Sequence, residues 1–294
     1  MGKVKEACQQ ITAGGSAGLV EVSIMHPLDV IKTRFQIQGT PNSNMQYSGM
    51  LDCVRQMTRQ EGTLSLYKGI LPPIMAETPK RATKFFTFEQ YKGLFLFGSP
   101  TPTPLTFTLA GLSSGLTEGV LINPFEVVKV RLQADQNNFK QQPSAFAMAK
   151  HVIRTDGFGS EGLARGLTAT LGRHGIFNMI YFGFYHNIKD YFPSSSDHRL
   201  ELLRRFTIGT IAGIIGSTVN IPFDVAKSRI QGPQPVPGQV KYKGCFRTIA
   251  MVYREEGFFA LYRGLVPKIM RLGPGGAIML LVYDYVYTWL RENT

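Results

Sequence analysis

Three short segments of this sequence set an acid and a lysine at fixed spacing behind a proline. Each follows the pattern Pro-x-acid-x-x-Lys-x-Arg-x-Gln, with the acid and the lysine three residues apart. Side chains three or four residues apart lie on one face of a helix, so each segment presents an acid and a base together. Three such helices that converge on one point would bring six charges into a ring. The members are Pro27, Asp29, Lys32 and Gln36; Pro124, Glu126, Lys129 and Gln133; and Pro222, Asp224, Lys227 and Gln231.

Further marks recur at the same period, and they predict three copies of one structural unit. The prolines are 97 and 98 residues apart, and a glycine pair precedes each of them in a small-x-x-x-small pattern typical of packed helices. An acidic-Gly turn and a basic-Gly pair follow each proline. The glycine pairs are Gly14 and Gly18, Gly111 and Gly115, Gly209 and Gly213; the turns and basic pairs are Glu61-Gly62 with Lys68-Gly69, Asp156-Gly157 with Arg165-Gly166, and Glu256-Gly257 with Arg263-Gly264.

Each unit is predicted to hold two long helices that flank a polar stretch with a short amphipathic helix, as at residues 51–59. The whole chain would then contain six long helices. Proline-rich and serine-rich breaks at residues 97–104 and 193–198 separate the units. The predicted boundaries are residues 7–97 for repeat 1, 104–192 for repeat 2 and 203–292 for repeat 3.

Composition limits the class of protein without choosing one. The 294 residues carry a formal charge of +12, which indicates an acidic partner: nucleic acid, an anionic membrane surface or an anionic solute. Mean hydropathy is −0.03, so hydropathy alone does not predict membrane spans. The three cysteines form no C-x-x-C pair, which argues against a zinc site or a disulfide framework. No secretory signal and no cleaved presequence is visible at the N-terminus.

The triplicated proline segment, with its acidic-Gly and basic-Gly elements, resembles the signature of the mitochondrial carrier family over nearly the whole chain. One copy would be a weak signal, because proline near an acid also starts ordinary soluble helices. Three copies in register argue against that reading. The resemblance implies an all-α, multi-pass protein of the mitochondrial inner membrane. It would have six transmembrane helices in three pseudo-threefold-related repeats, each with a short matrix-side amphipathic helix.

The resemblance also implies that the six charges act as a matrix gate. Proline in a crossing helix removes a backbone hydrogen bond and bends the axis, so Pro27, Pro124 and Pro222 would let the half-helices converge. Each acid is expected to pair with the lysine of a neighbouring helix and to close the matrix end of a water-filled cavity. Gln36 and its two counterparts are expected to brace the pairs from below. Charges at membrane depth are costly unless paired or hydrated, which favours a functional role.

The family's cytoplasmic gate follows the pattern aromatic-acid-x-x-base on the second long helix of each repeat. The segment from Phe88 to Lys92 fits it completely, with Glu89 as the acid. The other two copies each lack one charge. Two pairs remain plausible, Glu89 with Lys189 and Asp284 with Lys92, so the cytoplasmic lock is expected to be weaker than the matrix lock.

Equivalent positions seven residues past each basic-Gly glycine are Ala76, Arg173 and Arg271. The resemblance implies that these positions face the substrate. A guanidinium fork binds both oxygens of a carboxylate, so two arginines suit a dicarboxylate. His174 beside Arg173 is similar to the arrangement in keto-acid carriers of the family. The resemblance therefore implies antiport of five- to seven-carbon 2-oxodicarboxylates, such as 2-oxoadipate and 2-oxoglutarate, by alternating access.

A charged stripe on the second long helix is expected to line the cavity as well. Glu77, Arg81 and Lys84 fall at i, i+4 and i+7, which puts them on one helical face. The alternative for the two bases is snorkelling to a headgroup surface. For His174, a structural hydrogen bond is the alternative to substrate contact. The remaining histidines have no metal-ligand spacing, and no metal or cofactor is expected.

Other classes of function fit the residues less well. The bases recur beside acids and do not cluster with aromatic residues, which argues against nucleic-acid binding. Gly273-Pro274-Gly275-Gly276 lacks the lysine of a phosphate-binding loop and the strand before it, which argues against an enzyme. A soluble helical scaffold remains an alternative, as do another dicarboxylate, keto-acid or citrate carrier and an uncoupling-type proton or fatty-acid carrier. The expected partners are dicarboxylates and membrane lipid, in particular cardiolipin; the expected state is a monomer.

Overall fold

The computed structural model describes residues 2–38, 47–191, 193, 197–234 and 240–293, and these contain nine α-helices and no strand. Six helices are long and three are short, in the order long, short, long within each repeat. The long helices are α1 (Gly2–Ile37), α3 (Leu71–Leu94), α4 (Pro104–Ala134), α6 (Leu167–Ile188), α7 (His198–Gln231) and α9 (Leu265–Asn293). The short helices are α2 (Met50–Gln60), α5 (Ala145–Asp156) and α8 (Cys245–Glu256), and four 3-10 turns, η1 (Thr63–Tyr67), η2 (Phe139–Gln141), η3 (Lys189–Tyr191) and η4 (Phe258–Tyr262), lie between them.

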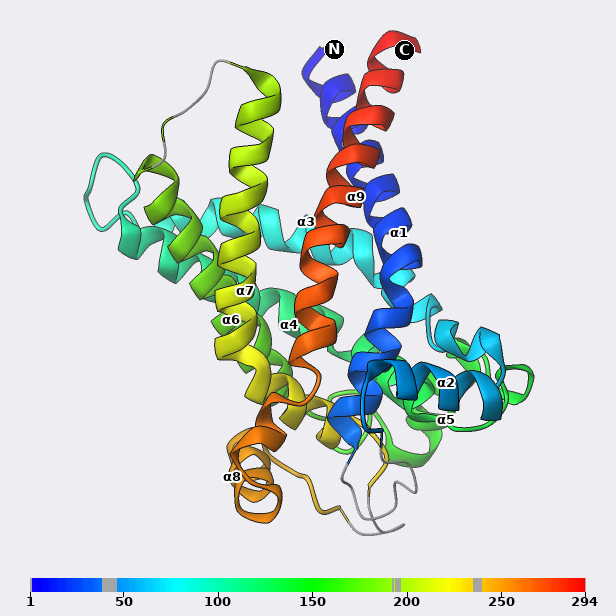
Figure 1. Ribbon diagram of the computed structural model, residues 1–294. Coiled ribbons are helices and arrows are strands. Elements are labelled where there is room, and N and C mark those ends of the chain that lie inside the picture. The colour runs from blue at the N-terminus through cyan, green and yellow to red at the C-terminus, as the bar shows by residue number, and fades with distance from the viewer. Residues whose placement is uncertain (1, 39–46, 192, 194–196, 235–239, 294) are drawn as a thin grey trace.

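The long helices form a closed bundle. Contacts run from α3 to α4, from α4 to α6 and from α6 to α7, and α9 packs along α1, so the last helix meets the first. The N-terminus of α1 and the C-terminus of α9 lie together at one end, and the short helices lie at the opposite end (Figure 1). This arrangement confirms the six long helices expected from the repeat, and α2 matches the amphipathic helix expected at residues 51–59.

The three signature prolines lie inside uninterrupted helices. Pro27 is within α1, Pro124 within α4 and Pro222 within α7, at matching places in the three repeats. A proline at such a place removes one backbone hydrogen bond from its helix, so the same weak point is repeated three times. The bend that it would cause stays a prediction.

The glycine pairs differ in how closely they are packed. In repeat 2, a Cβ on Gly115 would meet the carbonyl oxygen of His174 at 2.4 Å, and one on Gly111 would meet that of Asn178 at 2.7 Å. Only glycine permits this approach of α4 to α6. In repeat 1, by contrast, Gly14 has nothing within 4 Å. The small-x-x-x-small pattern therefore marks tight packing in repeat 2 and not at every copy.

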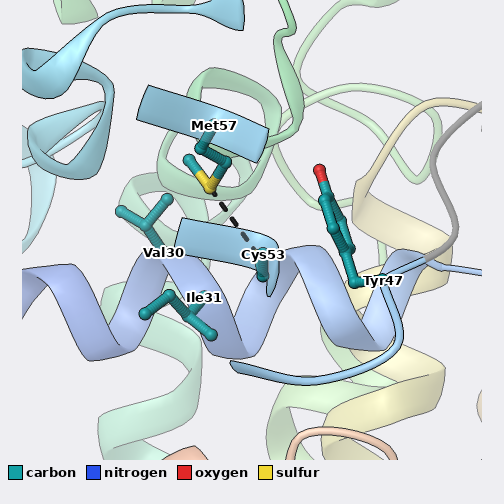
Figure 2. Close-up of a cluster of buried hydrophobic side chains, with 5 residues drawn as sticks. All are labelled: Val30, Ile31, Tyr47, Cys53 and Met57. Carbon is teal, nitrogen blue, oxygen red and sulfur yellow. Dashed lines mark hydrogen bonds between the residues drawn. The ribbon is translucent and has the colours of Figure 1, made fainter. Parts of the chain in front are cut away.

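The short helix α2 packs on the end of α1 through a small apolar cluster. Figure 2 shows Cys53 and Met57 of α2 against Val30 and Ile31 of α1, with Tyr47 beside them. Cys53 Sγ lies 3.8 Å from Met57 Sδ. Burial raises the pKa of the Cys53 thiol to about 12, so the thiol stays neutral and serves as core.

Hydropathy identifies only part of the bundle as membrane-spanning. Three segments among the described residues are long and apolar enough to cross a membrane: Pro104–Ala134, Leu200–Gln231 and Phe258–Glu292. Helix α3 falls short because it carries Lys80, Arg81 and Lys84 in its middle. Charges placed inside the bundle therefore conceal helices from a hydropathy scan.

Candidate functional site

Six charges from the proline segments meet in one ring of ion pairs, here called the ion-pair ring. Each acid pairs with the lysine of another helix, and the pairs link α1 to α4, α4 to α7 and α7 back to α1. Nitrogen to oxygen distances are 2.7 Å for Lys129 with Asp29, 3.1 Å for Lys227 with Glu126 and 2.9 Å for Lys32 with Asp224. All six side chains are buried or half-buried. The three pairs form a closed cycle, so each of the three helices is linked to both others.

The glutamines that follow the ring tie the same helices together. Gln133 accepts a hydrogen bond from Thr33 at 2.7 Å, and Gln36 accepts one from Ser228 at 2.7 Å. Within the described part of the chain, the hydrogen bonds of the three glutamines reach hydroxyls, an amide and a backbone carbonyl, and not the ring charges. These bonds join the helices one turn away from the pairs, and bracing of the pairs themselves stays a prediction. Valine follows the ring lysine in repeat 2, so Gln231 bonds to Asn123 at 3.1 Å instead.

A second layer of ion pairs joins the acidic-Gly and basic-Gly elements to the arginine of each proline segment. In repeat 1, Arg34 and Lys68 share Glu61, with Arg34 Nη2 at 2.8 Å. The equivalent residues of repeat 3 are Arg229 and Arg263 on Glu256. In repeat 2, Arg131 binds Asp156 at 2.8 Å. The repeat marks used to find the units therefore fasten the short connecting segments to α1, α4 and α7.

Repeat 2 leaves its basic-Gly arginine less well paired. Arg165 forms no ion pair with Asp156 within the described residues. Burial, and then the charge of Arg131, lower the pKa of Arg165. This connection is therefore the least neutralised of the three.

The two arginines at the predicted substrate positions both lie on acids of the ion-pair ring. Arg271 Nη1 is 2.8 Å from Asp29, and its Nη2 is 2.8 Å from Glu21. Arg173 pairs with Glu126 and lies 3.4 Å from Asp224. These acids thus hold a ring lysine and an arginine at the same time.

Helix α9 supplies one more base that the sequence reasoning missed. Lys268 Nζ lies 2.7 Å from Asp224, which Lys32 also binds. Four residues past the basic-Gly glycine, the other repeats have Pro73 and Thr170. A charge inside a predicted span was the signal that could have found it.

The α3 stripe faces this cluster. Glu77 is buried and pairs with Arg81 and with Lys80 at 3.2 Å. Arg81 also reaches Glu21 on α1 at 3.4 Å. Lys84 has no carboxylate partner among the described residues, and its ammonium lies 5.2 Å from the Phe182 ring centroid. The two bases therefore point inward, and the snorkelling alternative does not describe this structure.

Two buried acids complete the cluster and were also missed. Glu21 and Glu118 each stand six residues before the signature proline, where repeat 3 has Gly216. Glu118 accepts from His174 Nδ1 and Asn178 Nδ2, both at 3.0 Å. The signature begins at the proline and so excludes them, although an acid at the same offset in two repeats was visible.

A family model described as mitochondrial carrier protein matches residues 3–99, 101–196 and 198–294. The chain belongs to the mitochondrial carrier family. It is 62% identical over 290 residues to the human mitochondrial 2-oxodicarboxylate carrier, covering 99% of this chain and 97% of the relative. The same-named protein of Bos taurus is 63% identical over 293 residues, with 100% and 98% covered. The mitochondrial citrate transporter D of Aspergillus niger is 40% identical over 290 residues, with 96% and 94% covered.

Family membership gives the bundle its setting. This mitochondrial carrier is a multi-pass protein of the inner membrane, with three repeats. By the family's arrangement, the short helices α2, α5 and α8 mark the matrix side. Asp29 and Lys32 of the ion-pair ring lie near the C-terminal end of α1. The N-terminus of α1 and the C-terminus of α9 lie at the end of the bundle opposite the short helices (Figure 1).

The residues predicted to form the cytoplasmic gate make one ion pair among the described residues, and it lies within a single helix. Lys92 pairs with Glu89 in its own helix at 2.8 Å, and 64% of the Glu89 side chain is exposed. Within the described residues, no ion pair joins Glu89 to Lys189 or Asp284 to Lys92 in this conformation, and the expected pairing stays a prediction.

The charges of the middle of the bundle do not balance. Among the described residues, the ion-pair ring and the charged groups around it, as far as Lys84, include nine bases and six acids. The surplus charge is positive, and a positive surplus held among partly buried groups attracts anions. The bases are Lys32, Lys80, Arg81, Lys84, Lys129, Arg173, Lys227, Lys268 and Arg271; the acids are Glu21, Asp29, Glu77, Glu118, Glu126 and Asp224.

Proposed function

We propose that this carrier exchanges 2-oxodicarboxylates, such as 2-oxoadipate and 2-oxoglutarate, across the mitochondrial inner membrane. The observation that carries the proposal is the pair of arginines on α6 and α9, each held by acids of the ion-pair ring. Relatives named 2-oxodicarboxylate carrier, 62% identical over nearly the whole chain, support the same substrate class. The substrate would leave unchanged, so the activity is transport and not catalysis.

Substrate binding would act on the matrix gate by exchange of partners. A dicarboxylate that binds Arg173 with one carboxylate and Arg271 with the other takes both from the ring acids. Each charge-assisted hydrogen bond given up is replaced by one of the same kind to the substrate, so the change costs little overall. Of their lysine and arginine partners, Asp29 and Glu126 then keep only the lysines. A ligand shifts a conformational equilibrium only when it binds one state more tightly than the other. The exchange of partners would make the affinity for substrate differ between the closed and the open matrix gate.

The cytoplasmic gate would close as the ion-pair ring opens. In that state we propose the pairs Glu89 with Lys189 and Asp284 with Lys92, which are apart in the present conformation. Two pairs hold less strongly than three, so the matrix-open state should be the less stable locked state. This asymmetry follows from the missing acid and base in repeats 2 and 3.

Lipid and oligomeric state belong to the same proposal. One chain supplies all three repeats and closes its own bundle, so the monomer would be the transporting unit. Each short helix exposes an apolar side chain in its first turn, at Leu51, Phe146 and Phe246. An exposed base follows each, four residues on in α2 and α5 (Arg55 and Lys150) and next in sequence in α8 (Arg247). Apolar anchors beside positive charge suit an anionic lipid surface, and cardiolipin is the lipid we propose.

The positive surplus favours one second candidate. Three more bases than acids would accommodate a tricarboxylate such as citrate as well as a dicarboxylate. The 40% identity to a protein named mitochondrial citrate transporter D agrees with that candidate. Two arginines, and not three, lie at the substrate positions, which favours the dicarboxylate.

The proposal is tested by uptake of labelled 2-oxoglutarate into liposomes that contain the purified protein. The vesicles are loaded with 2-oxoadipate, malate, citrate, ATP or buffer alone. Strong exchange against 2-oxoadipate, with little against ATP or buffer, is the expected result. Exchange that is faster against citrate than against 2-oxoadipate would favour the second candidate. Failure with every oxo acid by folded protein would overturn the substrate assignment.

A further inference from the structure

Glu118 is a buried carboxylate on α4 that has no role in the proposed exchange of arginine partners. Only 2% of its side chain is exposed. Its two oxygens accept from His174 Nδ1 and Asn178 Nδ2 on α6, both at 3.0 Å. The tight contact of Gly115 with the His174 backbone fixes α4 against α6 at this point. The imidazole of His174 is therefore held by Glu118 at a place where the two helices approach closely.

The contacts of His174 suit one tautomer of the imidazole. A carboxylate only accepts, so the proton of the imidazole is on Nδ1, facing Glu118. The other ring nitrogen, Nε2, contacts the Arg173 guanidinium. A guanidinium only donates, so Nε2 must offer its lone pair. These two contacts fit a neutral imidazole with its proton on Nδ1.

We infer that His174 takes up one proton when substrate binds, so that transport of a 2-oxodicarboxylate dianion is coupled to a proton. The inference rests on the proposed function. A substrate carboxylate that draws Arg173 away removes the donor from Nε2 and one cation from Glu126. His174 Nε2 lies 3.8 Å from Glu126. A proton from water adds to the Nε2 lone pair, no other bond breaks, and the imidazolium then faces Glu118 on one side and Glu126 on the other.

The charges around His174 act in both directions. Lys80 and Lys84 from α3 act on Glu118, and Lys227 from α7 pairs with Glu126 at 3.1 Å, so these bases oppose protonation. Asp224 from α7 lies near Arg173, and its negative charge favours protonation of His174. Arg173 is the cation nearest to the imidazole, and it is the one whose charge the substrate neutralises. Substrate binding therefore removes the positive charge that opposes protonation of His174 most strongly.

Coupling to one proton gives the affinity a defined pH dependence. When the complex binds one more proton than the free protein, affinity falls by about tenfold for each unit that the pH rises. The interval from about pH 6.5 to 8.5 suits the measurement, because substrate carboxyl groups with an ordinary pKa near 4 stay ionised throughout. Without coupling, affinity for 2-oxoglutarate would be flat over this interval.

The test is calorimetric titration of the purified full-length carrier with 2-oxoglutarate in buffers of different ionisation enthalpy, which counts protons directly. Wild type is expected to take up about one proton per substrate. His174→Gln keeps a donor for Glu118 and an acceptor for Arg173 but cannot be protonated, so uptake should vanish and the affinity should lose its pH slope. His151 is an exposed histidine on α5, so His151→Gln is the matched control. This variant should keep both the proton uptake and the pH slope of the affinity.

Several outcomes would overturn the inference. Binding of 2-oxoglutarate by wild type without proton uptake would do so alone and would leave the proposed function intact. Uptake by His174→Gln equal to that of wild type would do so as well. Should that variant fail to fold, Glu118→Gln is the second test, and unchanged uptake there contradicts the inference. If wild type binds no oxo acid at any pH, both the proposed function and the inferred proton coupling are wrong.

Discussion

Arg271 and Lys129 bind opposite oxygens of one carboxylate, that of Asp29. Arg271 Nη1 lies 2.8 Å from Oδ1, and Lys129 Nζ lies 2.7 Å from Oδ2. A base at a proposed substrate position and a base of the ion-pair ring thus share a single acid. No relay through intervening residues is required, because whatever removes Arg271 changes the charge environment of the ring pair directly.

Replacement of Arg271 by alanine should slow exchange of 2-oxoglutarate by about ten- to a hundred-fold. One hydrogen bond to a charged group contributes about 1.5–3 kcal/mol, which corresponds to that range. Arg173→Ala should have a similar effect. The measurement is initial exchange rate in liposomes, normalised to folded protein.

The matched control for these arginines is Arg254→Ala, which removes an exposed arginine from α8. Its exchange rate should equal that of wild type. Wild-type exchange in either Arg173→Ala or Arg271→Ala would remove these residues from the substrate site.

Charge reversal in the ion-pair ring should be repaired only in part by reversing the partner. Asp29→Lys alone places two lysines together and should abolish exchange. Adding Lys129→Asp restores the pair, but Arg271 then faces a lysine, so recovery should stay clearly below wild type. Exchange rates of the two single variants and the double variant form the cycle that measures this. No recovery at all would refute the pairing, and full recovery would refute the role of Arg271.

The bundle and the ring could be derived from the sequence because both depend on marks that recur at a fixed period. Repetition places Asp29, Glu126 and Asp224 at equivalent points, and convergence of three equivalent helices brings them together. The same reasoning gives the long and short helices, although among the described residues hydropathy alone marks only three spans.

Other parts of the site could not be derived because spacing gives a position and not a partner. The seven-residue offset singles out Arg173 and Arg271 but says nothing about the acids that hold them. Glu21 and Glu118 precede the signature and were missed for that reason. The cytoplasmic pairs depend on which end of the carrier is closed, and a sequence does not specify a conformational state.

Gly115→Ala should destabilise the carrier. The added methyl would meet backbone atoms of His174 at 2.4 and 2.8 Å, and backbone cannot turn aside as a flexible side chain can. Overpacking of this kind costs about 1–3 kcal/mol. Thermal unfolding in detergent should show a lower midpoint.

Gly14→Ala is the control for that substitution, since Gly14 has nothing within 4 Å of an added Cβ. Its unfolding midpoint should match or exceed that of wild type, because alanine favours a helix over glycine. Equal midpoints for the two variants would contradict the tight approach of α4 to α6.

The thiols of Cys53 and Cys245 should resist alkylation in the folded carrier. Burial raises the pKa of Cys53 to about 12 and that of Cys245 to about 11, so little thiolate exists near neutral pH. Both thiols are neutral below an unfolded pKa of about 8.5, and the stability they contribute is lost as pH rises through the folded values. Maleimide labelling at pH 7 in a Cys8→Ser background, with denatured protein as control, checks this. Rapid labelling of folded protein would contradict the buried cluster in Figure 2.

The most direct measurement compares 2-oxoglutarate with 2-oxopentanoate, which has the same carbon chain and lacks the second carboxylate. If one carboxylate binds Arg173 and the other binds Arg271, the monocarboxylate leaves one arginine on its ring acid and should exchange at least about tenfold more slowly. Equal exchange rates for the two acids in wild-type liposomes would contradict the claim that both arginines must be drawn from the ring.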